Sequence, residues 1–205
     1  MDGPRDAGAR ERARGNARGR ATVKAIEQAA VRLAREVGVA GLTVDRICAE
    51  AGIKQRTFFN HFATKEDAIL GRELPRLDEQ RVREYLAATE VGVLTGALRL
   101  VVLPGTDDPA DTALAAARFE VLSTSPALAE RQAVRMLPLV GEVQAVVRLK
   151  LRQLEPEASE RSIDDAAAVV TQLGASLMLS RAPGRDPVPP EERVASLAWV
   201  WDKLL

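Results

Sequence analysis

Apolar side chains recur at intervals of three and four residues along almost the whole chain, and this spacing constrains the fold more than any other feature. From about residue 20 it places on one helical face the residues Val23, Ile26, Ala30, Leu33 and Val37. Almost no segment alternates apolar and polar residues in the manner of a half-buried strand. The pattern therefore predicts an all-α protein.

Glycine and capping residues divide the first part of this pattern into short helices. Gly38 predicts the end of the first helix, because glycine favours the left-handed conformation found just after a helix. Thr43 predicts the N-cap of a two-turn helix that ends at Gly52. A third short helix is predicted over 55–62. Two short helices joined by a tight turn on a supporting helix form a helix-turn-helix.

Later helices follow to the end of the printed sequence. Thr64, with Asp67 three residues on, predicts the N-terminus of a fourth helix, which Pro75 kinks or ends. Residues 71–205 are therefore predicted to form a second helical domain, with its clearest periodic segments over 94–103, 109–122, 126–154, 163–180 and 190–205.

The formal net charge of zero conceals an uneven distribution. Residues 1–65 carry thirteen Lys and Arg against seven Asp and Glu, whereas residues 66–205 carry sixteen against twenty-two. Residues 1–18, rich in Arg and poor in large apolar side chains, predict a disordered basic arm. It is either a solvated tail or a segment that follows a phosphate backbone or enters the minor groove of a nucleic acid. The basic end of the chain is expected to face an anion.

The single cysteine and the lack of a long apolar run limit the compartment and the class of protein. Cys48 excludes an internal disulfide framework and is expected to be a small core residue. The N-terminus has no apolar stretch of a secretory signal, and no run approaches the roughly 18 residues of a membrane span. We expect a cytoplasmic protein without a membrane partner.

The third short helix combines apolar anchors with polar residues. Ile53, Phe58 and Phe62 are expected to fasten it to the preceding helices, which leaves Lys54, Gln55 and Arg56 facing outward. A helix of this kind fits the major groove, where its N-terminal residues meet base edges. Taken alone, the same polar cluster also fits a solvated helix face.

The segment 41–70, "GLTVDRICAEAGIKQRTFFNHFATKEDAIL", resembles the DNA-binding segment of TetR-family transcriptional regulators. The resemblance covers about fifty residues, from Arg20 to Leu70, and beyond Leu70 it is only architectural. The positions that match the family signature are Leu42, Thr43, Ile47, Ala51, Gly52, Ile53, Thr57, Phe58, His61, Phe62, Lys65 and Glu66.

The resemblance implies a DNA-binding domain over 19–70 and a set of contacts to DNA. Gln55 and Arg56 would reach base edges, because Gln pairs with adenine and Arg with guanine. Lys65 would hold a phosphate together with the start of the fourth helix. The expected DNA-contacting residues are Thr43, Lys54, Gln55, Arg56, Thr57, Phe59, Asn60, His61 and Lys65.

Two positions in this segment carry open questions. Phe59 stands where the family usually has a Tyr whose hydroxyl contacts a phosphate, so that hydrogen bond is lost. Asp45 either accepts from a cytosine N4 amine or simply favours the N-terminus of its helix.

The resemblance also implies that residues 71–205 form a ligand-binding and dimerisation domain. The family expectation is a homodimeric repressor on a palindromic operator, released by a small, mainly apolar ligand. Core packing is an alternative use of the interface residues, and a surface ion pair is an alternative use of Arg118. The expected ligand-lining residues are Leu103, Arg118, Phe119, Leu122, Met136, Leu139 and Val143. The expected interface residues are Ala167, Val170, Leu173, Gly174, Leu177, Val194, Leu197 and Trp201.

Other classes of function fit the residues less well. The only His lies in the recognition helix, and the sequence has no Cys/His metal spacing and no Gly-rich phosphate loop, so we expect neither an enzyme nor a bound metal or cofactor. A helical protein-interaction module is the alternative from a different class. Within the DNA-binding class, an activator and a ligand-independent regulator remain open.

Overall fold

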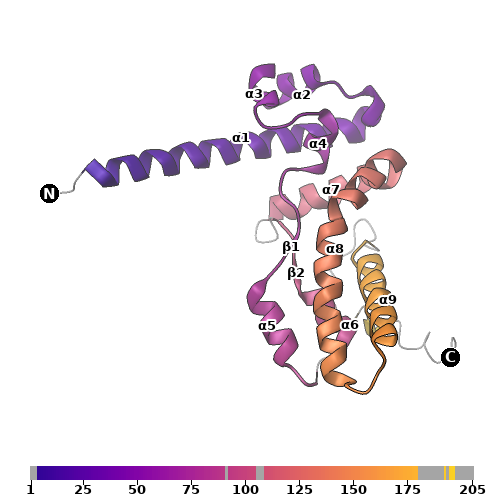
Figure 1. Ribbon diagram of the computed structural model, residues 1–205. Coiled ribbons are helices and arrows are strands. Elements are labelled where there is room, and N and C mark those ends of the chain that lie inside the picture. Colours follow the sequence, from indigo (N-terminus) through magenta and orange to yellow (C-terminus); the bar gives the residue numbers. More distant parts are fainter. Residues whose placement is uncertain (1–3, 91, 105–108, 180–191, 193, 197–205) are drawn as a thin grey trace. The chain divides into compact units, whose positions relative to one another are not determined.

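The computed structural model describes residues 4–90, 92–104, 109–179, 192 and 194–196. Within these ranges the chain is almost entirely helical, which confirms the predicted all-α class (Figure 1). None of the described helices is long and apolar enough to cross a membrane. Leu197 and Trp201, predicted at a dimer interface, lie outside the described residues, and Val194 is half-buried.

The chain forms two compact units, and each unit contains two separate segments of the sequence. Unit 1 contains Met1–Glu73 and Gly105–Gln132, and unit 2 contains Leu74–Pro104 and Ala133–Leu205. The sequence predicts a single division after residue 70. In the structure the chain leaves unit 1 close to that point but returns to it over 105–132, because this later segment packs on the first helix.

Unit 1 is built on one long helix. Around it lie three short helices and a later helix, which together bury an apolar core (Figure 1). The largest fully buried side chains of this core include Ile26, Leu42, Ile47, Phe58 and Ile69. The helices are α1 (Pro4–Gly41), α2 (Val44–Ala51), α3 (Gln55–Phe59), α4 (Lys65–Leu70) and α7 (Pro109–Thr124), followed by the start of α8 (Pro126–Leu154).

Helix α1 reaches further toward the N-terminus than the sequence predicts. A disordered arm is expected over 1–18, whereas the structure continues the helix back to Pro4. Ala and Arg, the most frequent residues of this stretch, are among the strongest helix formers, and they offset its glycines. At the other end Gly38 has a φ of 74° and interrupts the helix, as predicted.

The ends of the short helices follow their capping residues. Thr43 accepts a hydrogen bond from the backbone N–H of Arg46, and Thr64 accepts one from the backbone N–H of Asp67, so both N-caps are confirmed. Gly52 ends α2 with a φ of 65°.

Two of these helices are shorter than predicted. Helix α3 ends at Phe59 rather than at residue 62, and α4 ends at Leu70 because Gly71 has a φ of 81° and a non-helical ψ. The apolar residues after Gly71 therefore do not extend α4.

Unit 2 contains helices and one small sheet. Strands β1 (Arg76–Leu77) and β2 (Val101–Val102) pair antiparallel, with Arg76 opposite Val102. The helices are α5 (Glu79–Ala87), which the sequence does not predict, α6 (Val93–Arg99), the larger part of α8, and α9 (Glu160–Leu179). The core includes Tyr85, Leu100, Val147 and Ala167.

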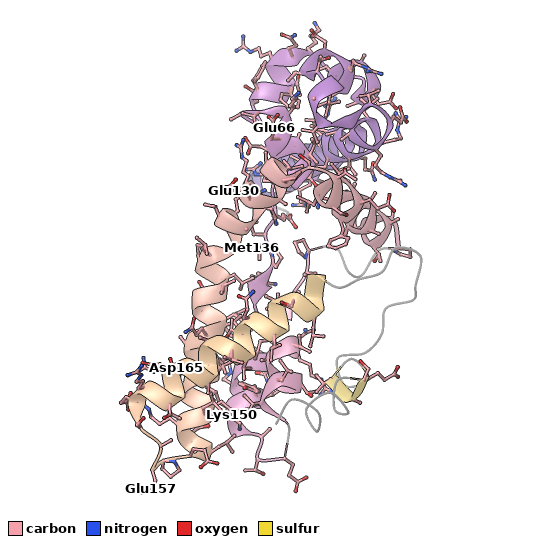
Figure 2. The ribbon with its side chains drawn as sticks, turned by 90° about the vertical axis from the view of Figure 1, so that its right-hand side faces the viewer. Glu66, Glu130, Met136, Lys150, Glu157 and Asp165 are labelled. Atoms are coloured by element: carbon pink, nitrogen blue, oxygen red, sulfur yellow. The ribbon has the colours of Figure 1, made fainter. Side chains whose placement is uncertain are left out.

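Charged groups join the helices of unit 2. Near the loop that joins α8 to α9, Arg148 of α8 pairs with Glu160 and Asp164 of α9 (Figure 1). The ammonium of Lys150, labelled in Figure 2, is buried and donates to the carbonyls of Leu86 and Ala88, at the end of α5. Since these carbonyls have no further helical partner, Lys150 closes the C-terminus of α5.

Tyr85 is the only tyrosine of the chain and gives a direct probe of unit 2. Its hydroxyl donates to the carbonyl of Val93, and burial raises the pKa of Tyr85 to about 12. We expect tyrosinate absorbance to titrate near that pH in the native protein and about two units lower in denaturant. Because the folded pKa is the higher one, the free energy of unfolding should fall once the pH exceeds about 10. Titration near 10 in the native protein would contradict the burial.

Candidate nucleic-acid interface

The short helix α3 is held from below by aromatic side chains. Phe58 is 0% exposed and Phe62 is 4% exposed, and both lie in the core of unit 1 with Ile47 of α2. The ring of Phe58 also meets that of Phe59 edge to face, with 5.4 Å between centroids. The apolar anchoring predicted for this helix is therefore present.

The polar residues of α3 lie on the exposed side of that anchor. Lys54, Gln55, Arg56 and Asn60 are all exposed, as a reading surface requires. Thr57 is half-buried. The structure thus brings most of the predicted contact residues together at one end and one side of a five-residue helix.

Phe59 is also part of this exposed surface. Its side chain is 55% exposed, which is unusual for a large apolar residue beside so many polar ones. Without the hydroxyl of the Tyr that the family usually has there, it can offer a sugar or a base only an apolar ring surface.

Thr43 and His61 flank the helix with different constraints. The Oγ1 of Thr43 accepts from the backbone N–H of Arg46 at 3.3 Å, and its own hydroxyl proton stays available for a phosphate oxygen. The Nδ1 of His61 is buried and has no hydrogen-bond partner among the described residues. Any contact of His61 with the DNA backbone would therefore come from Nε2.

Lys65 makes its hydrogen bonds within unit 1. Its ammonium donates to the carbonyls of Val39 and Leu42, at 2.8 Å and 2.7 Å, and the side chain is 24% exposed. Val39 lies in the last turn of α1 and Leu42 in its connection to α2, so the charge joins the start of α4 to the end of α1 and this connection. The structure gives Lys65 a role in holding the short helices together, which differs from the expected phosphate contact.

Gln55 has a partner that the sequence does not reveal. Its side-chain Nε2 donates to the Oδ1 of Asp45, which lies in the first turn of α2. The residue expected to reach a base edge is therefore joined to the preceding helix.

A second group of contacts in unit 1 fastens α7 to α1 and to the end of α4. The guanidinium of Arg118 pairs with Glu27 of α1 at 3.0 Å and donates to the carbonyl of Ile69 at 2.6 Å. The other oxygen of Glu27 accepts from the backbone N–H of Arg72. Gly71 leaves the room for this arrangement, since a Cβ there would lie 2.7 Å from Nη2 of Arg118.

Further ion pairs follow the same contact between α1 and α7. Lys24 pairs with Asp111, and Arg35 pairs with Glu120, both at 2.7 Å. Because the partners lie 85 or more residues apart, no local pattern could have revealed them.

The residues expected to line a ligand site are divided between the two units. Arg118, Phe119 and Leu122 belong to unit 1, whereas Leu103, Met136, Leu139 and Val143 belong to unit 2. Arg118 is occupied by Glu27 and the carbonyl of Ile69, so its use as an anchor for a ligand is not supported by the structure.

The expected dimer residues of α9 face the inside of unit 2. Ala167 is 0% exposed, and a Cβ on Gly174 would lie 3.7 Å from Leu98 of α6. Val170 packs against the core, and Leu173 and Leu177 are half-buried. The small residues of α9 thus allow a close approach to α6 within the chain, and their contact with a second subunit stays a prediction.

Other chemistry finds little support among the described residues. They contain no group of three or more His, Cys, Asp or Glu side chains arranged to hold a metal ion. Cys48 is buried, and burial, with a smaller contribution from the charge of Asp45, raises the pKa of its thiol. A raised pKa disfavours the reactive thiolate.

Residues 26–69 match the family model described as "Bacterial regulatory proteins, tetR family". The match spans the packed part of α1 and all of α2 and α3, and it ends within α4. No curated protein sequence matches the chain.

The position of Lys65 leads to a prediction about stability. Lys65→Ala should lower the free energy of unfolding by about 1–3 kcal/mol, because two partly buried carbonyls lose a charged donor. Denaturant unfolding measures this, with the exposed Lys54→Ala as the matched control, for which the change should stay within about 0.5 kcal/mol. Equal stability of the two variants would show that the contacts of Lys65 contribute nothing.

Proposed function

We propose, from the membership of this chain in the tetR family of bacterial regulatory proteins, that it is a homodimeric repressor of transcription. The chain is a DNA-binding transcription regulator. In the proposal two copies bind a palindromic operator, and a small, mainly apolar ligand releases them. Occupying a DNA site already excludes other proteins from it, so repression is the simplest consequence of binding.

The observation that carries the proposal is the arrangement of α3. Its buried Phe58 fixes the helix, and its first residues, Gln55 and Arg56, are exposed. Recognition helices of helix-turn-helix proteins place these N-terminal positions against base edges in the major groove. Lys54 and Arg56 add positive charge suited to phosphates and guanine.

An exposed apolar face in unit 2 supports the dimer. Val134, Leu137 and Leu149 of α8 are each more than half exposed, and they lie on one face of the helix together with Gly141 and Ala145. Val169 of α9 is also 56% exposed. A face of this kind is usual where a second subunit packs. We therefore assign the subunit contact to α8 and the outer side of α9.

Unit 2 also has features that suit a ligand. Met136, Leu139 and Val143 are half-buried on α8, in agreement with an aliphatic environment. The hydroxyl oxygen of Thr171 on α9 is buried and has no hydrogen-bond partner among the described residues. Because such a group is costly, a ligand with one polar atom would be stabilised there.

Contacts within unit 1 connect α7 and the start of α8 with α4, and through them we propose that ligand binding affects DNA binding. Helix α8 begins in unit 1 and continues into unit 2. Within unit 1, Arg131 at its start pairs with Asp67 of α4, and Arg118 of α7 holds the end of α4. A shift of α7 and of the start of α8 would therefore move α4 and the helices packed on it. Activation and ligand-independent regulation remain the alternatives within this class.

Salt dependence separates DNA binding from the rival role as a protein-interaction module. Binding to duplex DNA should weaken steeply as salt rises, because phosphate contacts release counterions. Replacing Lys54, Gln55 and Arg56 together by alanine should remove sequence preference and make the salt dependence shallower. Fluorescence anisotropy with labelled duplexes measures both. Unchanged binding by the triple variant would place the DNA contact elsewhere.

A charge on the exposed face of α8 should disrupt the dimer. Leu137→Glu is expected to convert the dimer into monomers in sedimentation experiments, because a carboxylate would be buried at the subunit contact. Leu154→Glu is the matched control, since Leu154 is exposed on the opposite side of the same helix. A dimer that survives the first change, or that is lost equally with the second, would contradict this assignment.

A further inference from the structure

We propose that Asp45 determines which base Gln55 selects, by fixing the orientation of its side-chain amide. The inference rests on the proposed function in one respect, namely that Gln55 meets a base edge. It gives a role to a carboxylate of α2 that neither the family match nor the sequence pattern assigns.

The two residues come together because of how α2 and α3 are joined. Asp45 lies in the first turn of α2, and Gln55 is the first residue of α3. Gly52, with its φ of 65°, turns the chain between the two helices, and the backbone N–H of Ile53 donates to the carbonyl of Cys48 at 3.0 Å. This turn brings the Nε2 of Gln55 into a hydrogen bond with the Oδ1 of Asp45.

The chemistry of the pair allows only one orientation of the amide. An ionised carboxylate has acceptors and no donor, so the nitrogen of Gln55, not its oxygen, must face Asp45. One N–H is then occupied by Asp45. In the proposal this is the N–H that points away from the carbonyl oxygen, so the amide keeps that oxygen and the N–H beside it on one edge.

That remaining edge matches one base better than the others. Adenine offers an acceptor at N7 and a donor at N6 next to each other in the major groove, and the bidentate pair of Gln with adenine uses both. An amide free to turn could instead present two donors to guanine or thymine, or its oxygen to cytosine. Asp45 thus acts as a positioning residue that favours adenine.

The two simpler roles of Asp45 predict different behaviour. A direct contact of Asp45 with a cytosine would read a base pair of its own, independently of Gln55. A role limited to the N-terminus of α2 would stabilise the helix and leave base preference unchanged. Because both side chains are exposed, substitutions at either position should leave the core of unit 1 intact.

The test measures discrimination between base pairs, using the full-length protein and a duplex selected from random sequences. For each variant, the dissociation constant is compared between this duplex and duplexes changed at one base pair. Gln55→Ala should reduce discrimination at one adenine of each half-site by about 5- to 150-fold. Asp45→Ala should reduce it at the same base pair by a smaller factor, and the double variant should equal Gln55→Ala alone.

Asp45→Asn tests the orientation most directly, because it keeps the size of the side chain and removes the restriction to acceptors. An asparagine amide can accept from the Nε2 of Gln55 or donate to its carbonyl oxygen, so both orientations of the Gln55 amide become available. Preference for adenine at that base pair should then fall relative to guanine and thymine, whose exposed atoms are acceptors. Thermal unfolding of each variant serves as the check on folding.

Four outcomes would overturn the inference. Unchanged discrimination in Asp45→Ala would leave Asp45 without a positioning role. An effect at a different base pair that persists in the Gln55→Ala background would show that Asp45 reads its own base. If Gln55→Ala alters no base pair while the protein still selects a sequence, the inference fails and the DNA-binding function stands. If the unaltered protein selects no sequence, both fail together.

Discussion

The burial of Phe58 is the interaction on which the DNA-binding surface depends. Helix α3 has five residues, far fewer than an isolated helix needs to be stable in water. Its geometry therefore comes from packing, with Phe58 and Phe62 in the core of unit 1 beneath it. Gln55 and Arg56 are held in place at the exposed end only because the aromatic side of the helix is fixed.

Charged side chains that donate hydrogen bonds to backbone carbonyls connect this surface to the rest of unit 1. Lys65 joins α4 to the connection between α1 and α2, and Arg118 joins α7 to the end of α4 and to Glu27. Charges of this kind are costly to bury unless their hydrogen bonds are satisfied. They make α7 part of the same compact unit as α2 and α3, so in our proposal a signal to DNA passes through α7 and the start of α8.

The ends of the short helices could be predicted from the sequence because they depend on neighbouring residues. The roles of charged side chains could not, because their partners lie far away in the sequence. Thr43, Gly52 and Thr64 mark helix ends through hydrogen bonds and backbone angles that involve only near neighbours. The partners of Lys65 and Arg118 lie 23 to 91 residues away, so their roles could not be inferred. The small residues of α9 fit an intersubunit or an intrachain contact equally well, and only the structure places Ala167 in the core.

The central claim, that two copies of α3 read a specific DNA sequence, is tested most directly by selecting random duplex DNA on the purified protein and sequencing what is retained. We expect a palindromic consensus whose half-sites lie roughly 34–36 Å apart, or a multiple of that distance, because the two recognition helices enter successive major grooves on one side of the duplex. Retained DNA with no enriched sequence, or with a single unrepeated half-site, would contradict it.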